Sequence, residues 1–417
     1  MAEYRKRLAD RAIDSALATF GAVIIEGPRA VGKTTTALQH VASAVRLDSG
    51  PELANLAEVS PSLVLAGDVP RLVDEWQLAP SIWNAVRHAV DERGRPGQFI
   101  MTGSAAPTDD VTRHSGAGRF RRVIIRPMSL MESGDSTGTV DFVDLFADGP
   151  VAGLGGPTVA DYARLIVRGG WPALVAQRGR SPGDYLGSYL DDVARVDIPA
   201  LGSRVDPMRM KALIRSLARN SATEAPATRL AAEAEVDDGG VSPQSVRKYL
   251  DALARVYVLE EQPAWLPHLR SAVRQRVRPK WHLIDPSLAA AALAASETVL
   301  LGEPKTLGFL FESLSIRDLR IYADVVGGTV SHYRDEQGLE VDAVVELPDG
   351  RWSAFEIKLG GQASIDAAAT NLKKLVARVT ESRAAALARL VVLTAGATSY
   401  VRDDGVAVVA LGHLAIR

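Results

Sequence analysis

One short motif constrains the fold of this chain more than any other feature. Residues 27–34 read Gly-Pro-Arg-Ala-Val-Gly-Lys-Thr, which matches the G-x-x-x-x-G-K-[ST] pattern of a phosphate-binding loop. Such a loop requires a strand before it and a helix after it, so that backbone N–H groups turn toward the phosphates. An apolar run at 22–26 and a helical pattern at 35–44 satisfy both conditions. The motif therefore predicts an α/β domain with a parallel sheet.

Hydrophobic patterning divides the chain into three parts. Apolar runs at 62–65, 71–73, 99–101 and 123–125 alternate with helical stretches such as 82–93, as in βαβ units. Six of the eleven residues from Ala147 to Pro157 are Gly or Pro, which indicates a linker. Residues 160–260 are mostly helical in pattern, and later segments mix strands with helices at 307–319 and 365–387. The predicted domains are 1–150, 151–300 and 301–417.

Composition excludes several classes of function. The chain has 417 residues, 47% of them hydrophobic, so it is globular. With 48 basic and 50 acidic residues the net charge is -2, and any nucleic-acid surface must be a local patch. There is no cysteine, which removes disulfides, thiolate nucleophiles and Cys-ligated metals, and the seven histidines show no zinc spacing. We find no signal peptide or membrane span, and expect a cytoplasmic protein without a membrane partner.

The phosphate loop predicts ATP and Mg²⁺ as ligands. Lys33 would reach the β- and γ-phosphates, and Thr34 would hold Mg²⁺. A chance glycine turn is the alternative, but the flanking strand and helix argue against it. The residues expected to bind the nucleotide are Gly27, Pro28, Arg29, Ala30, Val31, Gly32, Lys33, Thr34 and Thr35.

A pair of acids after the run at 71–73 supplies the second half of an NTPase site. Asp74 would bind Mg²⁺, and Glu75 would orient or activate the attacking water. Asp-Glu pairs are also common in solvated turns, so this assignment depends on the upstream loop.

Two further groups are candidates for contacts with the transferred phosphate. Thr102 and Ser104 follow the next strand-like run, where one hydroxyl could touch the γ-phosphate or the water, although ordinary loop chemistry would also explain them. Arg119 is a candidate arginine finger from its own or a neighbouring subunit. An arginine acting in trans would require a homo-oligomer, whereas an exposed structural arginine is the simpler alternative.

Taken together, these motifs resemble a group of prokaryotic AAA-type ATPases. The matching segments are GPRAVGKTT at 27–35, LVDEWQLAP at 72–80, FIMTGS at 99–104 and GRFRRVIIRPMSLME at 118–132, with further similarity at 168–175 and 189–199. The resemblance implies an N-terminal P-loop ATPase domain, a helical region with a winged-helix unit at about 208–285, and a C-terminal restriction-endonuclease-like α/β domain.

The middle region carries a predicted helix, turn and helix. Residues 228–234 and 242–253 are the two helices, with Ser242 as a helix N-cap. Val246, Leu250 and Leu253 would face the core, and Gln244, Arg247 and Lys248 would face outward toward DNA.

A basic segment follows these helices. Between residues 270 and 280 there are five basic residues and no acidic one, namely Arg270, Arg274, Arg276, Arg278 and Lys280. This patch could bind a DNA backbone, which would make the affinity depend strongly on salt. The alternatives are a solvated hairpin or a face packed against Asp191, Asp192 or Asp197. Winged helices also bind proteins, so a protein partner is the alternative to DNA.

The last domain contains a set of charged residues that resembles the PD-(D/E)xK nuclease core. Asp342 lies in one strand-like run, and Glu356 and Lys358 share one face of the next, with Glu312 on the preceding helix. In such a core Asp342 and Glu356 would bind Mg²⁺ and Lys358 would position a water. A fold does not imply its function, so cleavage of DNA is a separate hypothesis.

These observations leave competing functions. The first is an Mg²⁺-dependent ATPase coupled to DNA binding, with or without DNA cleavage. The second is a nucleotide-dependent regulatory or scaffold protein whose nuclease-like domain is inactive. A third, an NTP-dependent kinase or ligase for a small molecule, has less support because no acceptor site is apparent.

Overall fold

The computed structural model describes residues 4–104, 116–147, 149–177, 179–202, 205–234, 241–266 and 277–417. Contacts divide the chain into two compact units. Unit 1 comprises residues 1–126, 196–204 and 251–258, and unit 2 comprises residues 127–195, 205–250 and 259–417. Among the described helices, none combines the length and the apolar character needed to cross a bilayer.

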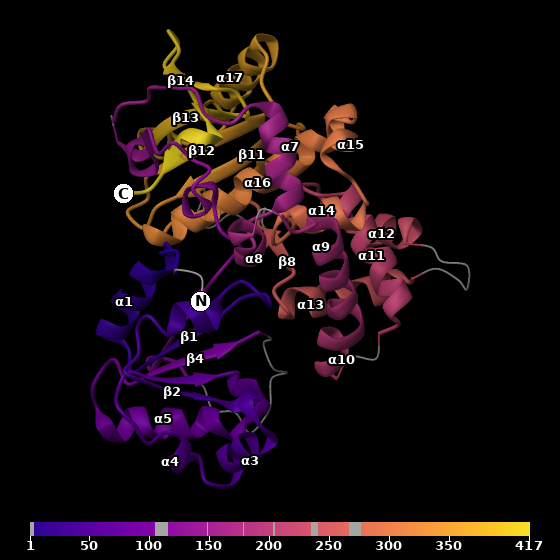
Figure 1. Ribbon diagram of the computed structural model, residues 1–417. Helices are drawn as coiled ribbons and strands as arrows, with labels where there is room; N and C mark the ends of the chain where they lie inside the picture. The colour runs from indigo at the N-terminus through magenta and orange to yellow at the C-terminus, as the bar shows by residue number, and fades with distance from the viewer. Residues whose placement is uncertain are drawn as a thin grey trace. The chain divides into compact units, whose positions relative to one another are not determined.

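Unit 1 is built on a five-stranded parallel sheet with the order β2-β3-β4-β1-β5 (Figure 1). Strand β4 lies between β1 and β3, with Gly103 opposite Glu26 and Thr102 opposite Asp74. The carboxyl ends of these three strands therefore lie at one edge of the sheet. The strands are β1 Ala22–Glu26, β2 Ser43–Arg46, β3 Arg71–Asp74, β4 Phe99–Gly103 and β5 Phe120–Ile124.

Helices bury both faces of this sheet, so every residue of β1 is buried. Val23 and Ile25 pack with Ile13 of the first helix. Ala22 and Ile24 belong to a second core cluster, which includes the Trp83 side chain. The helices are α1 Ala9–Thr19, α2 Lys33–Ala37, α3 Pro51–Val59, α4 Pro61–Val64 and α5 Ser81–Arg93.

Two predicted elements of unit 1 differ from the structure. The apolar run at 62–65, predicted as a strand, belongs mostly to helix α4, where Pro61 occupies the first turn and presets a helical backbone. The predicted helix at 35–44 is only five residues long. Ser43 to Arg46 instead pair in parallel with β3, because this pairing satisfies backbone N–H and C=O groups of both strands.

Unit 2 contains a seven-stranded mixed sheet with the order β10-β11-β12-β13-β15-β14-β7. Helix α17 follows β12, which pairs in parallel with β13, and packs on one face of the sheet (Figure 1). Its residues Leu372 and Leu375 belong to one core cluster with Trp352 and Ala354. The predicted long helix at 365–387 is two shorter helices, α17 and α18. Its last predicted residue, Leu387, instead begins β13. The elements are β7 Gly153–Leu154, α16 Pro304–Val325, β10 Thr329–Arg334, β11 Glu340–Glu346, β12 Trp352–Lys358, α17 Gln362–Val376, α18 Glu381–Ala385, β13 Leu387–Thr394, β14 Thr398–Val401 and β15 Ala407–Ala410.

The predicted domain boundary near residue 150 differs from the division seen in the structure. The first segment of unit 1 ends at Arg126, and the chain then enters unit 2. Residues 127–158 pack in unit 2, because β6 Val140–Asp141 pairs with β16 Leu414–Ala415. The Gly- and Pro-rich segment also contributes β7, which pairs with β14 at the sheet edge. Sequence composition indicated a loop there, but it could not show that the loop adds a strand to a distant sheet.

The middle of the chain is mainly helical. Val246, Leu250 and Leu253 of helix α13 are buried, as predicted. Strands β8 and β9 pair antiparallel after this helix, and Thr223 forms a bridge with Trp281 of β9. The elements are α6 Leu130–Ser133, α7 Val159–Arg168, α8 Pro172–Ala176, α9 Pro182–Asp192, α10 Ile198–Ala200, α11 Pro207–Arg219, α12 Ala227–Glu233, α13 Pro243–Arg255, β8 Leu259–Gln262, β9 Lys280–Leu283, α14 Pro286–Ala292 and α15 Glu297–Gly302.

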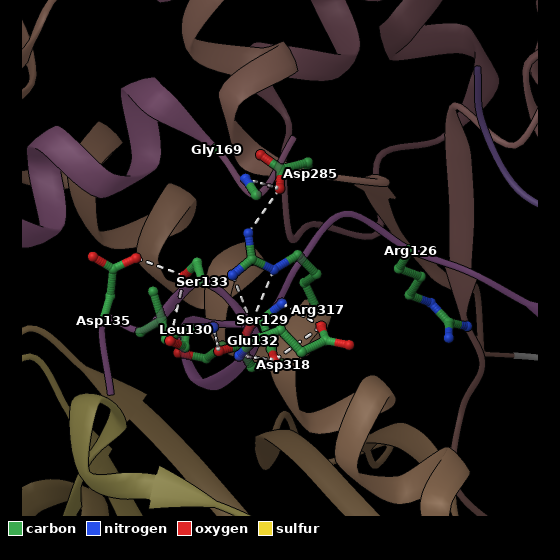
Figure 2. Close-up of polar contacts among 12 residues, drawn as sticks. Arg126, Ser129, Leu130, Glu132, Ser133, Asp135, Gly169, Asp285, Arg317 and Asp318 are labelled. Carbon is green, nitrogen blue, oxygen red and sulfur yellow. Dashed lines mark hydrogen bonds and ion pairs between the residues drawn. The ribbon is translucent and has the colours of Figure 1, made fainter. Parts of the chain in front are cut away.

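A buried polar network ties distant segments of unit 2 together (Figure 2). Arg317 lies between Asp285, at 2.7 Å from its Nη1, and Asp318, at 2.7 Å from its Nη2. Asp318 also accepts a hydrogen bond from the backbone N–H of Leu130 at 2.9 Å. Asp285 accepts another from the N–H of Gly170 at 3.1 Å. The network accounts structurally for two of the sequence motifs, at 118–132 and 168–175.

Candidate functional site

The phosphate loop leaves β1 through backbone conformations that favour glycine. Gly27 has a φ of 148°, and a Cβ there would lie 2.2 Å from the carbonyl oxygen of Ile125. Gly32, immediately before α2, has a φ of 98°. Both positions lie in the region of φ that L side chains rarely adopt. The two glycines of the motif are therefore required by the shape of the loop itself.

Lys33 points back into the loop. Its Nζ donates hydrogen bonds to the carbonyl oxygens of Gly27 at 3.0 Å and Pro28 at 2.8 Å, and the side chain is buried. Burial lowers the pKa of Lys33 to about 8, although the charges of Glu75 and Asp74 act in the opposite direction. An ammonium held by neutral carbonyls inside a glycine loop is suited to bind phosphate oxygens.

Asp74 and Thr34 meet at the carboxyl edge of the sheet. The Thr34 hydroxyl donates to the Asp74 carboxylate, with Oγ1 at 2.8 Å from Oδ1 and 3.1 Å from Oδ2. Thr102 Oγ1, on the neighbouring strand, also donates to Asp74 Oδ1. Carboxylate and hydroxyl oxygens side by side fit Mg²⁺, which prefers oxygen ligands. Thr34 and Asp74 are therefore the residues that would hold this ion, and this role stays a prediction.

Glu75 follows directly and adopts a left-handed backbone with a φ of 56°. Its backbone N–H donates to Thr102 Oγ1 at 3.3 Å. Its side chain accepts hydrogen bonds from Gln77 and, at 3.4 Å, from the Ser104 hydroxyl. The carboxylate is thus held at the same sheet edge as Asp74, where a general base for the attacking water is needed.

Arg119 lies at the opposite edge of the sheet. Its carbonyl oxygen accepts from the N–H of Ala22, the first residue of β1, at 3.1 Å. Its side chain pairs with Asp91 at 2.6 Å. The five residues of β1 separate this edge from the loop by about 17 Å. Within one chain Arg119 therefore does not join the phosphate site, and a role in trans stays a prediction.

Asp197 has a different partner from the one considered in the sequence analysis. It pairs with Arg29 of the phosphate loop, with Arg29 Nη1 2.7 Å from Asp197 Oδ1. Asp191 pairs with Lys211. Of the predicted basic patch, Arg270, Arg274 and Arg276 lie outside the described residues, and Arg278 is exposed.

The charged residues predicted in the last domain do come together in unit 2. Lys358 Nζ lies 3.0 Å from Asp342 Oδ2 and 2.7 Å from Glu356 Oε2. Burial alone would raise the pKa of Asp342, but Lys280 and Lys358 outweigh it and hold that pKa below its usual range. Burial, reinforced by the charge of Asp342, raises the pKa of both Glu312 and Glu356. We call the set Glu312, Glu340, Asp342, Glu356, Lys280 and Lys358 the acidic centre.

Lys280 corrects a prediction, because it is not part of an exposed basic patch. Its side chain is 2% exposed, and its Nζ lies 2.8 Å from Glu312 Oε1 and 2.8 Å from Glu340 Oε1. Asp342 Oδ1 is 3.7 Å away. Burial would lower the pKa of Lys280, but the three carboxylates raise it well above the ordinary value. Lys280 is therefore a charged, buried member of the acidic centre.

The acidic centre does not fit the Mg²⁺ ion that the nuclease resemblance implies. Asp342 Oδ2 accepts from Lys358 and, at 2.8 Å, from the N–H of Ile357. Glu356 accepts from Lys358 and, at 2.5 Å, from Asn371. In the part of the chain that the structure describes, no group of three or more His, Cys, Asp or Glu side chains is arranged to hold a metal ion.

Sequence reasoning missed three members or neighbours of this centre. Glu340 lies two residues before Asp342, on the same face of β11, and strand alternation could have revealed it. Asn371 on α17 and Lys280 on β9 carry no such signal. Only the tertiary packing brings them to the carboxylates.

Family models match three successive stretches of the chain. Residues 19–133 match the model of an AAA domain. Residues 159–299 match a domain of unknown function, DUF8612, and residues 307–414 match another, DUF4143. The AAA match and the loop geometry identify a P-loop AAA-type ATPase domain, and they support ATP binding and hydrolysis by this part of the chain.

Similar whole proteins are also known. Uncharacterized proteins of Mycobacterium bovis and Mycobacterium tuberculosis are each 27% identical over 354 residues, which cover 82% of this chain and 71% of the relative. A solved structure of a Walker-type ATPase of Pyrococcus abyssi has a TM-score of 0.40 and 12% identity, over 68% of this chain and 94% of that chain.

Proposed function

We propose that this protein is an Mg²⁺-dependent ATPase that couples hydrolysis to DNA binding. The observation that carries the proposal is the contact of Thr34 with Asp74 beside the ammonium of Lys33. These groups would bind a metal and phosphates at the same sheet edge.

Each side chain has a separate task in this reaction. Lys33 would bind the β- and γ-phosphate oxygens and offset the charge that develops on them. Glu75 would accept the proton of the attacking water. Thr102 hydrogen-bonds both the Asp74 carboxylate and the backbone N–H of Glu75, and would hold these two residues in position. Mg²⁺, when bound by Thr34 and Asp74, would neutralise charge on the phosphates.

The test is Glu75→Gln, measured for both ATP binding and hydrolysis. Loss of the base should lower kcat by about 10²–10⁴-fold, while ATP affinity stays close to wild type. Glu92→Gln, at an exposed position near the end of α5, is the matched control and should hydrolyse ATP normally. Hydrolysis by Glu75→Gln at the wild-type rate would contradict the assignment.

DNA binding is proposed through the middle of the chain. Helices α11, α12 and α13, followed by the β8–β9 pair, occur in the order of a winged helix, and Gln244, Arg247 and Lys248 are exposed on α13. The variant Arg247→Ala/Lys248→Ala should weaken DNA binding and reduce its salt dependence. A control with the same loss of charge, Arg180→Ala/Lys305→Ala, should leave both unchanged. Equal effects of the two pairs would argue against this surface.

DNA cleavage is a second candidate, favoured by the assembly of Glu312, Asp342, Glu356 and Lys358 on α16, β11 and β12. The competing function, an inactive nuclease-like domain that only binds, is favoured by Lys280. Cleavage of single- and double-stranded DNA with Mg²⁺ or Mn²⁺, with and without ATP, distinguishes the two. Cleavage that Lys358→Ala abolishes would support a nuclease, and its absence from protein that hydrolyses ATP would support a binding domain.

An assembly of several copies is a further part of the proposal, because Arg119 could reach a phosphate site only from another chain. Sedimentation with and without ATP should show a nucleotide-dependent oligomer. Mixing Arg119→Ala with Lys33→Ala would then restore some hydrolysis if the arginine acts in trans.

A further inference from the structure

The acidic centre contains its own cation at the point where several carboxylates converge. Lys280 Nζ lies within 2.8 Å of Glu312 and Glu340 and 3.7 Å from Asp342. Carboxylates of α16 and β11 thus converge on one nitrogen atom. Glu312 and Asp342 are buried, whereas Glu340 is partly exposed. The two buried carboxylates require a cation, since an uncompensated buried charge is costly.

Lys280 is held in this position by the strand that carries it. Strand β9 pairs with β8, where Lys280 lies opposite Gln262. Two residues along β9, His282 is buried between Gln262 Oε1 at 2.9 Å and Ser313 Oγ of α16 at 3.0 Å. Gln262 in turn donates to the carbonyl oxygen of Asp342 at 2.9 Å. The backbone around Lys280 is therefore fixed to the same two elements, α16 and β11, that supply the carboxylates.

The second lysine of the centre, Lys358, also occupies carboxylate oxygens that a metal ion would need. Lys358 contacts Asp342 and Glu356, and Asn371 and the N–H of Ile357 occupy further oxygen lone pairs. A divalent ion would have to displace ammonium groups that are already hydrogen-bonded. Mg²⁺ also demands near-octahedral oxygen coordination, which these occupied oxygens do not offer.

We propose that the ammonium of Lys280 replaces the divalent metal of a nuclease-like centre, so that this centre is a metal-free site whose carboxylates are paired with the ammonium groups of Lys280 and Lys358. The proposal concerns unit 2 alone and stands whether or not the chain hydrolyses ATP. It follows that removal of Lys280 converts the centre into a site for a divalent cation.

Mn²⁺ binding to the full-length chain without nucleotide tests this conversion. Lys280→Ala should bind one more Mn²⁺ per chain than wild type, and Lys280→Ala/Asp342→Asn should lose it again. Lys373→Ala, which removes an exposed lysine paired with Asp404 on the same unit, is the matched control and should gain no site. No added Mn²⁺ in folded Lys280→Ala would overturn the proposal.

Thermal stability gives an independent readout of the same conversion. A ligand that binds only the folded state raises Tm, so Mn²⁺ should stabilise Lys280→Ala but not wild type at concentrations that fill the new site. An equal Tm shift in the two proteins would contradict the replacement.

A measurement on the wild-type protein covers the case in which Lys280→Ala does not fold. Fe²⁺ with ascorbate and peroxide cleaves the backbone close to a bound metal, and the fragments identify the site. Wild type should show no cleavage within β11 or β12. Cleavage of these strands, abolished by excess Mg²⁺, would show that a divalent ion enters the centre despite Lys280 and would overturn the proposal.

Discussion

The phosphate site of unit 1 and the acidic centre of unit 2 use the same kinds of side chain in opposite ways. In the phosphate site, Lys33 donates to carbonyl oxygens, and Asp74 accepts from two threonine hydroxyls. In the acidic centre, Lys280 and Lys358 donate directly to carboxylates.

The difference shows how contacts decide what a charged cluster can bind. Neutral carbonyl oxygens hold Lys33. Asp74 accepts from two threonine hydroxyls and has one longer ion pair, with the exposed Arg46, whose Nε lies 3.5 Å from Asp74 Oδ2. The amine thus stays suited to phosphate and the carboxylate to Mg²⁺. Direct ion pairs in unit 2 satisfy the charges within the protein. The same substitution should therefore have opposite consequences in the two places.

The largest expected effect is on the stability of unit 2. Lys280→Met leaves three carboxylates without their shared cation, and loss of one partner from a buried ion pair costs about 3–5 kcal/mol. Urea denaturation followed by tryptophan fluorescence measures the change. Lys373→Met, at an exposed pair, should cost less than about 1 kcal/mol. Equal losses in the two variants would remove the contrast between buried and exposed lysines.

The counterpart in unit 1 should lose activity rather than stability. Lys33→Met removes the cation from the phosphates and should lower ATP hydrolysis by about 10²–10³-fold. Among the described residues, the hydrogen-bond partners of this buried ammonium are backbone carbonyl oxygens. Its replacement by an apolar side chain should therefore leave the urea midpoint at or above the wild-type value. A large loss of stability would show that Lys33 is structural in the way that Lys280 is.

A smaller effect is expected at the hydroxyl that supports Asp74. Thr102→Val keeps the shape of the side chain but removes the hydrogen bond to the Asp74 carboxylate, which is worth about 1.5–3 kcal/mol. Hydrolysis should fall by about tenfold, with little change in ATP affinity. Thr19→Val, at an exposed threonine of α1, serves as the control. An unchanged rate would mean that Asp74 needs no such support.

The smallest effect is a pH dependence next to the acidic centre. Burial, with the charge of Lys280, lowers the pKa of His332 to about 4. Arg334 acts in the same direction, while the carbonyl of Arg278 and the charge of Glu340 oppose it. Between pH 6.5 and 4 the unfolded chain binds the proton more readily, so folding stability falls as the pH falls.

His332→Gln should flatten this dependence. The free energy of unfolding of wild type should lose about 1 kcal/mol more than that of the variant between pH 6 and pH 5. His88→Gln, at an exposed position on α5, should retain the wild-type slope. Parallel curves for wild type and His332→Gln would show that His332 is not the group that titrates.

Sequence reasoning predicts most of the phosphate site because its parts are local. The strand, the two glycines and Lys33 are contiguous, and Asp74 follows its own short strand. Thr102 lies beside Asp74 because β4 is the neighbour of β3 in the sheet, and the sequence alone does not reveal the order of the strands. The strand β2 was missed for the same reason, since pairing with β3 overrides its local helical pattern.

The acidic centre shows where such reasoning ends. Alternation along β12 placed Glu356 and Lys358 on one face, and this was correct. The basic run around Lys280 suggested a surface, whereas the residue points inward from β9. In the sequence, a buried charged residue whose ion-pair partners come from distant segments looks the same as a solvent-exposed one. Its partners are close in space but not adjacent in the sequence.

The polar network around Arg317 has a consequence for the order in which parts of the protein fold during synthesis. Leu130 and its partner Asp318 are 188 residues apart. At about 5–20 residues per second, a ribosome needs about 10–40 s to bring the second partner out after the first. Residues 4–126, by contrast, contain all five strands of the unit 1 sheet. The emerging chain can therefore assemble that sheet before the partners of the segment after Arg126 have been synthesised. During this interval that segment is most exposed to chaperones and proteases.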